Sequence, residues 1–340
     1  MSKKETKELF PKSILKWVGG KHSIIKNVIS NFPDEINNYH EIFLGGGTVL
    51  FSLLYYQQLK KIKINGNIYA YDYNLQLINL FNDIRDNPIE LFDELSKIIE
   101  EYKKIKIENQ AKDYKKIERR KLKKNPKKGE SIYKYEKKYK PTNIQEALHD
   151  KESYYYWIRK QYNDLISSNI HDLKISALFI FLNKTCFRGL YRVGKDNTTK
   201  KIGFNVPYGN YKNPSIIEKD KLNNISSLIQ NVTFIHSDFS HSLKNIKKGD
   251  FIYLDPPYVP EKKDSFTSYT NDNFNGEKHQ NLFDKIKSID EKFLMSNSYV
   301  KFVKDNFKSE KFKIEVITVR RSINSKNPES ETKEVLIKNF

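Results

Sequence analysis

The chain has 340 residues, enough for one large domain or two modest ones, and 38% of them are apolar. Lys and Arg number 61 against 42 Asp and Glu, and the net charge of +19 favours a polyanionic partner such as nucleic acid. A mean hydropathy of −0.72, one cysteine and first residues without an apolar run argue against secreted, membrane-spanning and zinc-finger classes. We therefore expect a cytoplasmic protein with no membrane partner and no bound metal.

Short strand-like runs alternate with helix-period stretches along most of the chain. The strand-like runs are 39–44, 67–71, 232–236, 251–254, 293–296 and 313–319, and helical stretches include 76–81, 88–102 and 280–288. This alternation predicts an α/β fold with a Rossmann-like, doubly wound, mostly parallel sheet whose ligand site lies at the carboxyl ends of the strands. Residues 81–225 are helical, basic and rich in tyrosine, so we expect a domain inserted there, between 1–80 and 226–340.

The positive charge is concentrated between residues 103 and 140. This stretch holds seventeen Lys or Arg against five Asp or Glu, and Asn125-Pro126 and Gly129 interrupt any continuous helix. Two interpretations stay open. The run is either a solvated insertion whose like charges repel each other, or an arm that neutralises DNA phosphates without reading sequence.

Three glycines, Gly45, Gly46 and Gly47, follow the first strand-like run and precede a helix-like stretch. Glycines let a ligand approach the backbone, and the N-terminus of the following helix offers free N–H groups. Asp72 ends the next strand-like run, where a carboxylate suits the two hydroxyls of a nucleoside ribose. This pattern alone leaves a nucleotide-type ligand and a plain tight turn about equally open.

The tetrapeptide Asp255-Pro256-Pro257-Tyr258 follows the apolar run 251–254 and is the stronger signal. Two prolines stiffen the turn and remove two N–H donors, which leaves carbonyl acceptors. The Asp255 carboxylate and a neighbouring main-chain carbonyl can together hold both hydrogens of an exocyclic amine. The Tyr258 ring offers a flat face for a base. This order of residues predicts a binding site for a nucleobase amine rather than a solvated surface turn.

With its other motifs, the chain resembles the Dam-like (alpha-group) adenine-N6-specific DNA methyltransferases. The matching segments are 15–21 (LKWVGGK), 43–48 (FLGGGT), Asp72 with Asn74, 185–192 (TCFRGLYR), 204–209 (FNVPYG), 237–239 (SDF), 255–258 (DPPY), 296–298 (SNS), Arg320-Arg321 and 334–340. They follow one another over most of the chain, and 103–140 falls outside them. The resemblance implies the S-adenosylmethionine-dependent methyltransferase fold and a mainly helical target-recognition domain that carries a β-hairpin.

The resemblance also implies a cofactor, S-adenosyl-L-methionine, and a transfer reaction. The residues it assigns to the cofactor are Trp17, Lys21, Phe43, Gly45, Gly47, Asp72, Asp238 and Asp255. Among these, Asp72 would hold the ribose, Lys21 the cofactor's carboxylate and Asp238 its adenine. The target adenine would be flipped out of double-stranded DNA. Asp255 and the Pro256 carbonyl would hold its amino hydrogens and Tyr258 would stack on its ring, with Pro257 completing this catalytic turn.

For DNA recognition the resemblance points to the segment 185–211 and to one residue before it. The positions are Lys16, Phe187, Arg188, Leu190, Arg192, Asn205, Pro207 and Tyr211. Phe187 would wedge between bases, and Lys16 and Arg192 suit guanine acceptors. The family usually has Asn where this chain has Arg188, and the hairpin is lengthened by residues 194–203. GATC is the target that we expect first, and these two departures make a longer or degenerate site that contains GAT the alternative.

Other functions stay open at this point. The first alternative is cytosine-N4 methylation of DNA, which also modifies an exocyclic amine; Asp rather than Ser at position 255 favours adenine. A nucleotide-dependent oxidoreductase would use the glycine loop and Asp72 but would leave the DPPY turn unexplained. A non-catalytic DNA-binding relative would have no need of that turn. The expected setting is DNA marking or restriction–modification in a prokaryotic or viral host, with a cognate restriction endonuclease as a second expected partner.

Overall fold

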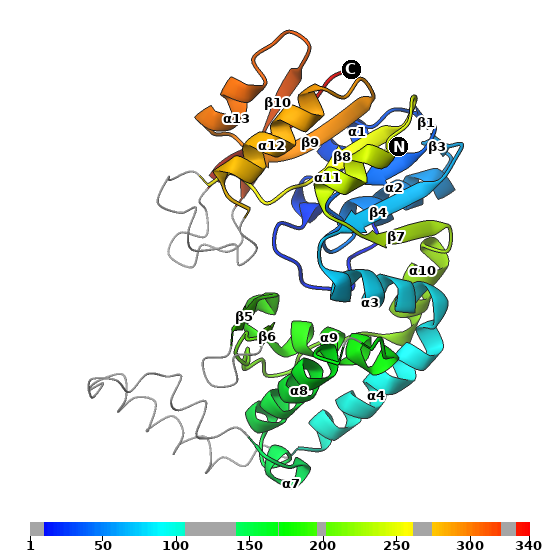
Figure 1. Cartoon of the computed structure of the whole chain (residues 1–340). Helices are drawn as coiled ribbons and strands as arrows, with labels where there is room; N and C mark the ends of the chain where they lie inside the picture. The colour runs from blue at the N-terminus through cyan, green and yellow to red at the C-terminus, as the bar shows by residue number, and fades with distance from the viewer. Residues whose placement is uncertain (1–9, 106–140, 169, 196–201, 261–273, 321–330) are drawn as a thin grey trace, which may run out of the picture. The chain divides into compact units, whose positions relative to one another are not determined.

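The computed structural model describes residues 10–105, 141–168, 170–195, 202–260, 274–320 and 331–340. The chain splits into two compact units, unit 1 (Met1–Asn87 with Asp220–Phe340) and unit 2 (Pro88–Lys219) (Figure 1). The boundaries expected from the sequence, after residues 80 and 225, fall inside helices α3 (Leu75–Asp86) and α10 (Lys219–Leu228). Most of the basic run 103–140 lies outside the described residues, so both interpretations of it stay open.

Unit 1 is built on a seven-stranded sheet with the order β10-β11-β9-β8-β2-β4-β7. The strands are β2 (Tyr39–Glu41), β4 (Ile68–Asp72), β7 (Val232–His236), β8 (Phe251–Leu254), β9 (Lys292–Ser298), β10 (Lys313–Arg320) and β11 (Glu331–Lys338). Strands β7, β4, β2, β8 and β9 are parallel, whereas β11 pairs antiparallel with β9 and β10. The expected mostly parallel α/β sheet is confirmed, and β11 is the strand that the sequence analysis did not expect.

Helices cover both faces of this sheet. They are η1 (Lys21–Ser23), α1 (Ile25–Ser30), α2 (Thr48–Gln58), α3, α10, α11 (Phe239–Ser242), η3 (Leu243–Asn245), α12 (Gly276–Lys287) and α13 (Lys301–Asn306). A small separate sheet is formed by β1 (Glu35–Ile36) and β3 (Lys63–Ile64). Every residue of β8 is buried, which is typical of a parallel strand between two helical layers. Ile252 packs in a core with Phe283 of α12, and the ring of Phe32 meets the ring of Phe251 edge-on at 4.8 Å.

Unit 2 is mainly helical and contains one β-hairpin. Its described elements are α4 (Pro88–Lys104), α7 (Ile144–Ala147), α8 (Lys151–Ile166), α9 (Leu173–Thr185), η2 (Phe187–Gly189) and antiparallel β5 (Val193–Lys195) with β6 (Ile202–Phe204). Helix α9 is buried from Ile175 to Thr185. The rings of Tyr102 of α4, Tyr154 of α8 and Phe181 of α9 all contact one another, with centroids 5.3–6.2 Å apart. These aromatic contacts form a core that belongs to unit 2 itself.

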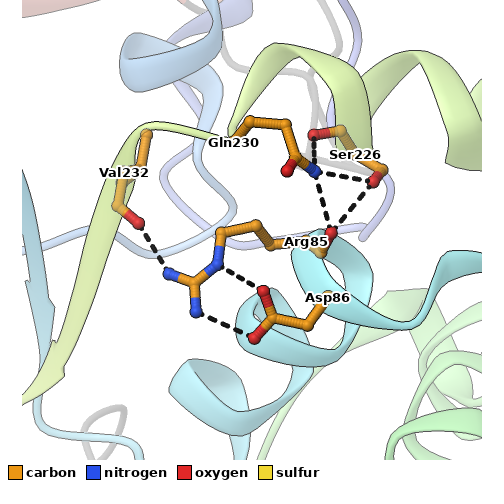
Figure 2. A network of polar contacts seen from close by, with 5 residues as sticks. All are labelled: Arg85, Asp86, Ser226, Gln230 and Val232. Carbon is orange, nitrogen blue, oxygen red and sulfur yellow. Dashed lines mark hydrogen bonds and ion pairs between the residues drawn. The ribbon is translucent and has the colours of Figure 1, made fainter.

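Inside unit 1, a polar network ties together the two passages that connect it to the inserted segment (Figure 2). Arg85, in the last turn of α3, donates to the Val232 carbonyl at 2.7 Å and makes bidentate bonds with Asp86 at 2.7 and 2.8 Å. The Arg85 carbonyl accepts from Ser226 Oγ at 3.2 Å and from Gln230 Nε2 at 2.9 Å. Because α3 leads out of unit 1 and α10 leads back into it, the network holds both passages at the start of β7.

A second buried network, at the start of β8, carries a stability prediction. Asp250 is 2% exposed and accepts from Asn38 Nδ2 at 2.7 Å, His40 Nε2 at 3.0 Å and the Lys247 amide at 2.9 Å. Asp250→Ala leaves these donors buried without an acceptor, so we expect it to lower the free energy of unfolding by about 3–5 kcal/mol. Urea unfolding of Asp250→Ala measures this change in the free energy of unfolding, with Asp250→Asn, which keeps one acceptor, measured for comparison. Equal stability of Asp250→Ala and the wild type would contradict it.

Among the described residues, no helix combines the length and apolar character that crossing a bilayer requires.

Candidate active site

The carboxyl ends of β2 and β8 lie side by side where the strand order of the sheet reverses. The chain runs from β2 to β4 on one side, whereas β8 flanks β2 on the other side, with Glu41 paired to Tyr253. The glycine loop follows β2, and the DPPY turn, Asp255 to Tyr258, follows β8. Ligands of open α/β sheets bind at such a reversal, beyond the carboxyl ends of the strands. The fold therefore brings together the two motifs that the sequence analysis singled out separately.

The glycine loop has a backbone shape that depends on glycine. Gly45 and Gly47 have φ values of +50° and +72°, a region that side-chain-bearing residues rarely adopt. A Cβ atom on Gly45 would lie 3.0 Å from Cδ1 of Trp17, so the indole packs directly against the loop. Gly47 is also the N-cap of α2, which directs the free N–H groups of that helix to the same edge of the sheet. The structure thus places Trp17, Gly45 and Gly47 together.

Asp72 lies at the end of β4 and holds the glycine loop from that side. Its Oδ2 accepts a hydrogen bond from the Gly45 amide at 2.9 Å, and its Oδ1 accepts one from the Asn74 amide at 2.9 Å. Asn74 in turn caps α3. The Asp72 carboxylate therefore connects the strand end, the loop and a helix start, which positions it beside the backbone that a nucleoside would approach.

Two other residues expected at the cofactor have structural partners in unit 1. The partly buried Phe43 ring packs against the rings of Phe239 and Phe274, with centroids 6.1 and 6.0 Å apart. Asp238 is the N-cap of α11 and accepts from the Ser240 amide at 2.8 Å through Oδ1. Their cofactor contacts stay predictions.

Asp255 has one paired and one unpaired carboxylate oxygen. Its Oδ2 lies 2.7 Å from Nζ of Lys21, whose side chain is 5% exposed. Its Oδ1 is buried and has no hydrogen-bond partner in the described part of the chain. Burial raises the pKa of the Asp255 carboxyl to about 6, against the lowering effect of the Lys21 ammonium. Asp255 is therefore ionised at neutral pH and presents an acceptor with no bond to give up.

Lys21 takes a place that the sequence analysis did not expect. Its ammonium donates to the Gly19 carbonyl at 2.7 Å, pairs with Asp255 and lies 4.8 Å above the centre of the Tyr258 ring. The resemblance assigned Lys21 to the carboxylate of the cofactor instead. In this structure, the lysine links the N-terminal segment to the DPPY turn, and any contact with the cofactor stays a prediction.

The DPPY turn is fixed by contacts from three other elements. The Pro257 carbonyl accepts from Nε2 of His279 in α12 at 2.8 Å, and the Tyr258 hydroxyl donates to Glu334 of β11 at 2.9 Å. After the turn, the Val259 amide donates to Asn297 Oδ1 of β9 at 3.2 Å. Since the two prolines have no N–H, these contacts and the Lys21 pair hold the turn from outside.

Glu41 adds a second buried acid beside this turn. It is 2% exposed, lies in β2 opposite Tyr253, and accepts from the Tyr39 hydroxyl at 2.7 Å. Burial raises the pKa of Glu41 to about 8, the bond from Tyr39 lowers it, and the charge of Asp255 raises it. Glu41 is therefore mostly protonated and neutral at pH 7, so it does not repel the Asp255 carboxylate beside it.

In unit 2, the residues expected to meet DNA gather on the loops around η2 and the hairpin. Phe187 is 44% exposed, Arg188 is exposed, and the Arg188 guanidinium lies 5.2 Å from the centre of the Phe187 ring. The Phe187 amide donates to the Pro207 carbonyl at 2.8 Å, which joins the two ends of the segment. Leu190, Pro207 and Tyr211 are partly buried.

Two of the expected DNA contacts are bonded to each other. Arg192 Nε donates to Asn205 Oδ1 at 2.7 Å, and the Asn205 amide donates to the Arg192 carbonyl at 3.0 Å. Both side chains are exposed, so this pair faces solvent from the base of the hairpin. Lys16, the eighth expected contact, is exposed on the N-terminal segment of unit 1. Cys186 is buried and its Sγ lies 3.3 Å from the Leu190 carbonyl, which fits a structural role.

The family model for the D12 class N6 adenine-specific DNA methyltransferases matches residues 17–137 and 114–323. The chain belongs to this family. It is therefore an adenine-specific DNA methyltransferase, and the alternatives of cytosine-N4 transfer, hydride transfer and DNA binding without catalysis give way to this assignment.

Curated relatives agree with the D12 assignment over nearly the whole chain. The type II methyltransferase M.MjaIII of Methanocaldococcus jannaschii is 33% identical over 97% of this chain and 99% of its own. The type II methyltransferase M1.LlaDCHI of Lactococcus lactis subsp. cremoris is 28% identical over 96% and 94%. A DNA adenine methylase of Haemophilus influenzae is 29% identical over 94% and 90%. The setting of adenine-N6 marking and restriction–modification is thus supported by these names.

Three residues of the D12 site were missed by the sequence analysis. Glu41 carried a weak signal, since it is a charged residue inside the apolar run 39–44. His279 carried none, and Glu334 lies in the matching segment 334–340 without an assigned role; these two residues contact the turn from 22 and 76 residues away. Within the described ranges, no group of three His, Cys, Asp or Glu side chains is arranged to hold a metal ion.

Proposed function

We propose that this methyltransferase uses S-adenosyl-L-methionine and transfers its methyl group to N6 of an adenine flipped out of duplex DNA. The cofactor would lie along the glycine loop, with Asp72 at its ribose, Trp17 against the loop, and Phe43, Asp238 and Lys21 nearby. When bound, the cofactor supplies an activated methyl group on a positively charged sulfur. The glycine loop supports this fit, since a Cβ atom on Gly45 would lie only 3.0 Å from the Trp17 indole and glycine leaves the backbone open to close approach by a ligand.

This reaction requires the protein to align the reacting groups and to stabilise them electrostatically, and it requires no covalent enzyme intermediate. The buried, unpartnered Oδ1 of Asp255 is the observation that carries the proposal, because an amine hydrogen would satisfy it. A hydrogen bond from N6 to this oxygen, and a second to the Pro256 carbonyl, would fix the amino group. The lone pair of N6 would then point toward the methyl group of the cofactor. The stacked Tyr258 ring would hold the plane of the base.

The proton leaving N6 after transfer also has a place in this scheme. The Asp255 carboxyl has its pKa raised to about 6 by burial, so it holds a proton more readily than an exposed aspartate. Above that pH it is ionised and accepts hydrogen bonds; once N6 carries the extra methyl group and positive charge, Asp255 is the nearest base. We propose that Asp255 both orients the amine and takes up its proton.

Unit 2 would serve as the target-recognition domain of this enzyme. Phe187 would enter the gap left by the flipped adenine. Arg188, Leu190, Arg192, Asn205, Pro207, Tyr211 and Lys16 would contact base edges or nearby phosphates. We propose GATC, or a longer or degenerate site containing GAT, as the target, and a restriction endonuclease of the same specificity as a partner. The enzyme would work in the cytoplasm beside the DNA of a prokaryotic or viral host.

The Arg188 backbone supports a role for that side chain in binding DNA. Arg188 has a φ of +57°, where Asn is tolerated better than Arg. A residue kept at such an angle suggests that its side chain serves a purpose other than stability. We expect Arg188→Asn to weaken binding of target duplex by about ten-fold, as loss of one arginine contact should, without lowering the melting temperature. Fluorescence anisotropy with a labelled duplex measures the affinity.

Lys60→Asn is the matched control for Arg188→Asn. Lys60 is also basic and exposed and has a φ of +56°, but it lies just after the C-cap of α2 in unit 1. We expect it to leave DNA affinity unchanged. Unchanged affinity in Arg188→Asn, or an equal loss in both variants, would remove the proposed contact.

The experiment that tests the proposed function measures transfer of tritiated methyl from S-adenosylmethionine to unmethylated duplex DNA. Nucleosides from the digested product identify the base, and long-read sequencing of DNA from a methylation-free host that expresses the protein identifies the site. We expect N6-methyladenine at a single site containing GAT. Label in no nucleoside would contradict the cofactor, and methylation at sites without GAT would contradict the proposed target.

A further inference from the structure

The hydroxyl of Tyr258 is held by an acid from a distant strand. It donates to Glu334 Oε2 at 2.9 Å, 76 residues along the chain. Glu334 lies in β11 and pairs in register with Ser298 of β9, while β9 pairs with β8, which leads into the DPPY turn. Strand pairing across three strands therefore sets the position of this carboxylate beside the turn.

The Tyr258 ring has two restraints that do not involve a base. Glu334 fixes the hydroxyl end of the side chain, and the Lys21 ammonium lies 4.8 Å above the ring centre. The ring needs no hydroxyl to stack on a base, because stacking uses its face. A hydroxyl hydrogen bond instead fixes the tilt of the ring, and a carboxylate acceptor makes that bond stronger than a neutral one.

Glu334 also acts on Asp255 by charge. Four elements bring titratable groups to Asp255: Lys21 from η1, Glu41 from β2, Tyr253 from β8 with Tyr258 after it, and Glu334 from β11. Lys21 favours the ionised carboxylate and Glu334 disfavours it. Since Glu41 has its pKa raised to about 8, it is largely neutral at pH 7 and contributes little charge there.

We propose that Glu334 is a positioning residue of the methyl-transfer site, which holds the Tyr258 ring through its hydroxyl and opposes the Lys21 charge at Asp255. This inference rests on the proposed roles of Asp255 and Tyr258. Glu334 itself touches neither substrate. It sets the tilt of the stacking ring and adds a negative charge to the surroundings of Asp255.

Two substitutions separate these effects. Glu334→Gln keeps an oxygen that can accept from the Tyr258 hydroxyl but removes the negative charge. Removing that charge favours the Asp255 anion, so its ionisation should move to lower pH by on the order of half to one unit. Glu334→Ala removes the acceptor as well, and we expect kcat to fall by about ten-fold with little change in KM for DNA, as for a lost positioning contact.

The test combines a titration with a double-mutant cycle. NMR of cofactor-free protein with ¹³C-labelled aspartate follows Asp255 in the wild type, Glu334→Gln and the control Glu315→Gln, an exposed acid of β10. In parallel, kcat is measured for Tyr258→Phe, Glu334→Ala and both together. We expect the titration to shift only in Glu334→Gln. We also expect the double mutant to lose about ten-fold, like either single mutant, because both substitutions break the same bond.

Either of two results would overturn the proposal. One is an Asp255 titration that is the same in Glu334→Gln and wild type; the other is losses that multiply to about a hundred-fold in the double mutant. Melting temperatures within a few degrees of wild type establish that the variants are folded. The titration needs no turnover, so a failure of the methyl-transfer proposal would show as a wild type that transfers no methyl group, which is a separate observation.

Discussion

Asp255→Ala is expected to lower kcat for DNA methylation by about 10³-fold, which is typical for loss of a preorganised group at a reacting centre. The substitution removes the buried Oδ1 that has no partner in the described structure and so removes the acceptor for the target amine. Asp255→Asn keeps a neutral oxygen in a side chain of similar shape, so its kcat should lie between those of Asp255→Ala and the wild type. Single-turnover transfer of tritiated methyl, with enzyme in excess over duplex, measures the chemical step directly.

The loss in Asp255→Ala must be separable from loss of structure or cofactor. Calorimetric titration with S-adenosylmethionine should give a dissociation constant within about ten-fold of the wild type, since the glycine loop and Asp72 are intact. Asp305→Ala, which removes an exposed carboxylate of α13, serves as the matched control and should keep wild-type kcat. A kcat for Asp255→Ala within ten-fold of the wild type would refute the assigned role.

Lys21→Met is expected to move the acid limb of activity to higher pH. The wild type needs the Asp255 anion, so kcat/KM for S-adenosylmethionine, which reports the cofactor-free enzyme, should fall as pH drops through about 6. Lys21 lies 2.7 Å from Asp255 and favours the anion. Without it, burial is unopposed and the limb should rise by about 1–3 units. At pH 7, protonation alone would then lower the activity by about two-fold for a rise of one unit and by about a hundred-fold for a rise of three.

The position of the limb, rather than the size of the loss, is the decisive measurement for Lys21→Met. Lys21→Arg restores a cation and should return the limb to below pH 7. Lys26→Met removes an exposed cation of α1 and should leave it near pH 6. An acid limb of Lys21→Met that coincides with the wild type would show that the ion pair does not set the ionisation of Asp255.

Much of the sheet could be predicted from local patterns. The runs 232–236 and 251–254 coincide with β7 and β8. Strand β8 is buried on both faces and is apolar at every position, whereas β7, at the edge of the sheet, alternates buried and exposed residues over its first three positions. Strand β11 was not expected. Its sequence ETKEVLIK begins with charged residues, and its place is set by antiparallel pairing with β9 and β10, which local sequence does not encode.

The candidate site also has some parts that local sequence predicts and others that it does not. The glycine loop, Asp72 and the DPPY turn have local signatures, since each needs particular residue types at the end of a strand. The contacts that hold the turn have none: Lys21 is separated from Asp255 by most of the chain, and only the fold brings its ammonium within 2.7 Å of that carboxylate. His279 looks like any polar residue of an amphipathic helix until its Nε2 is seen 2.8 Å from the Pro257 carbonyl.

A crystal structure of the enzyme with a target duplex and a cofactor analogue that cannot donate its methyl group tests the central claim most directly. The account predicts an adenine outside the base stack, its N6 within about 3.2 Å of Asp255 Oδ1, which is hydrogen-bond distance, and its ring on Tyr258. An extruded adenine whose N6 is held by other groups, with Asp255 Oδ1 turned away from it, would contradict the account.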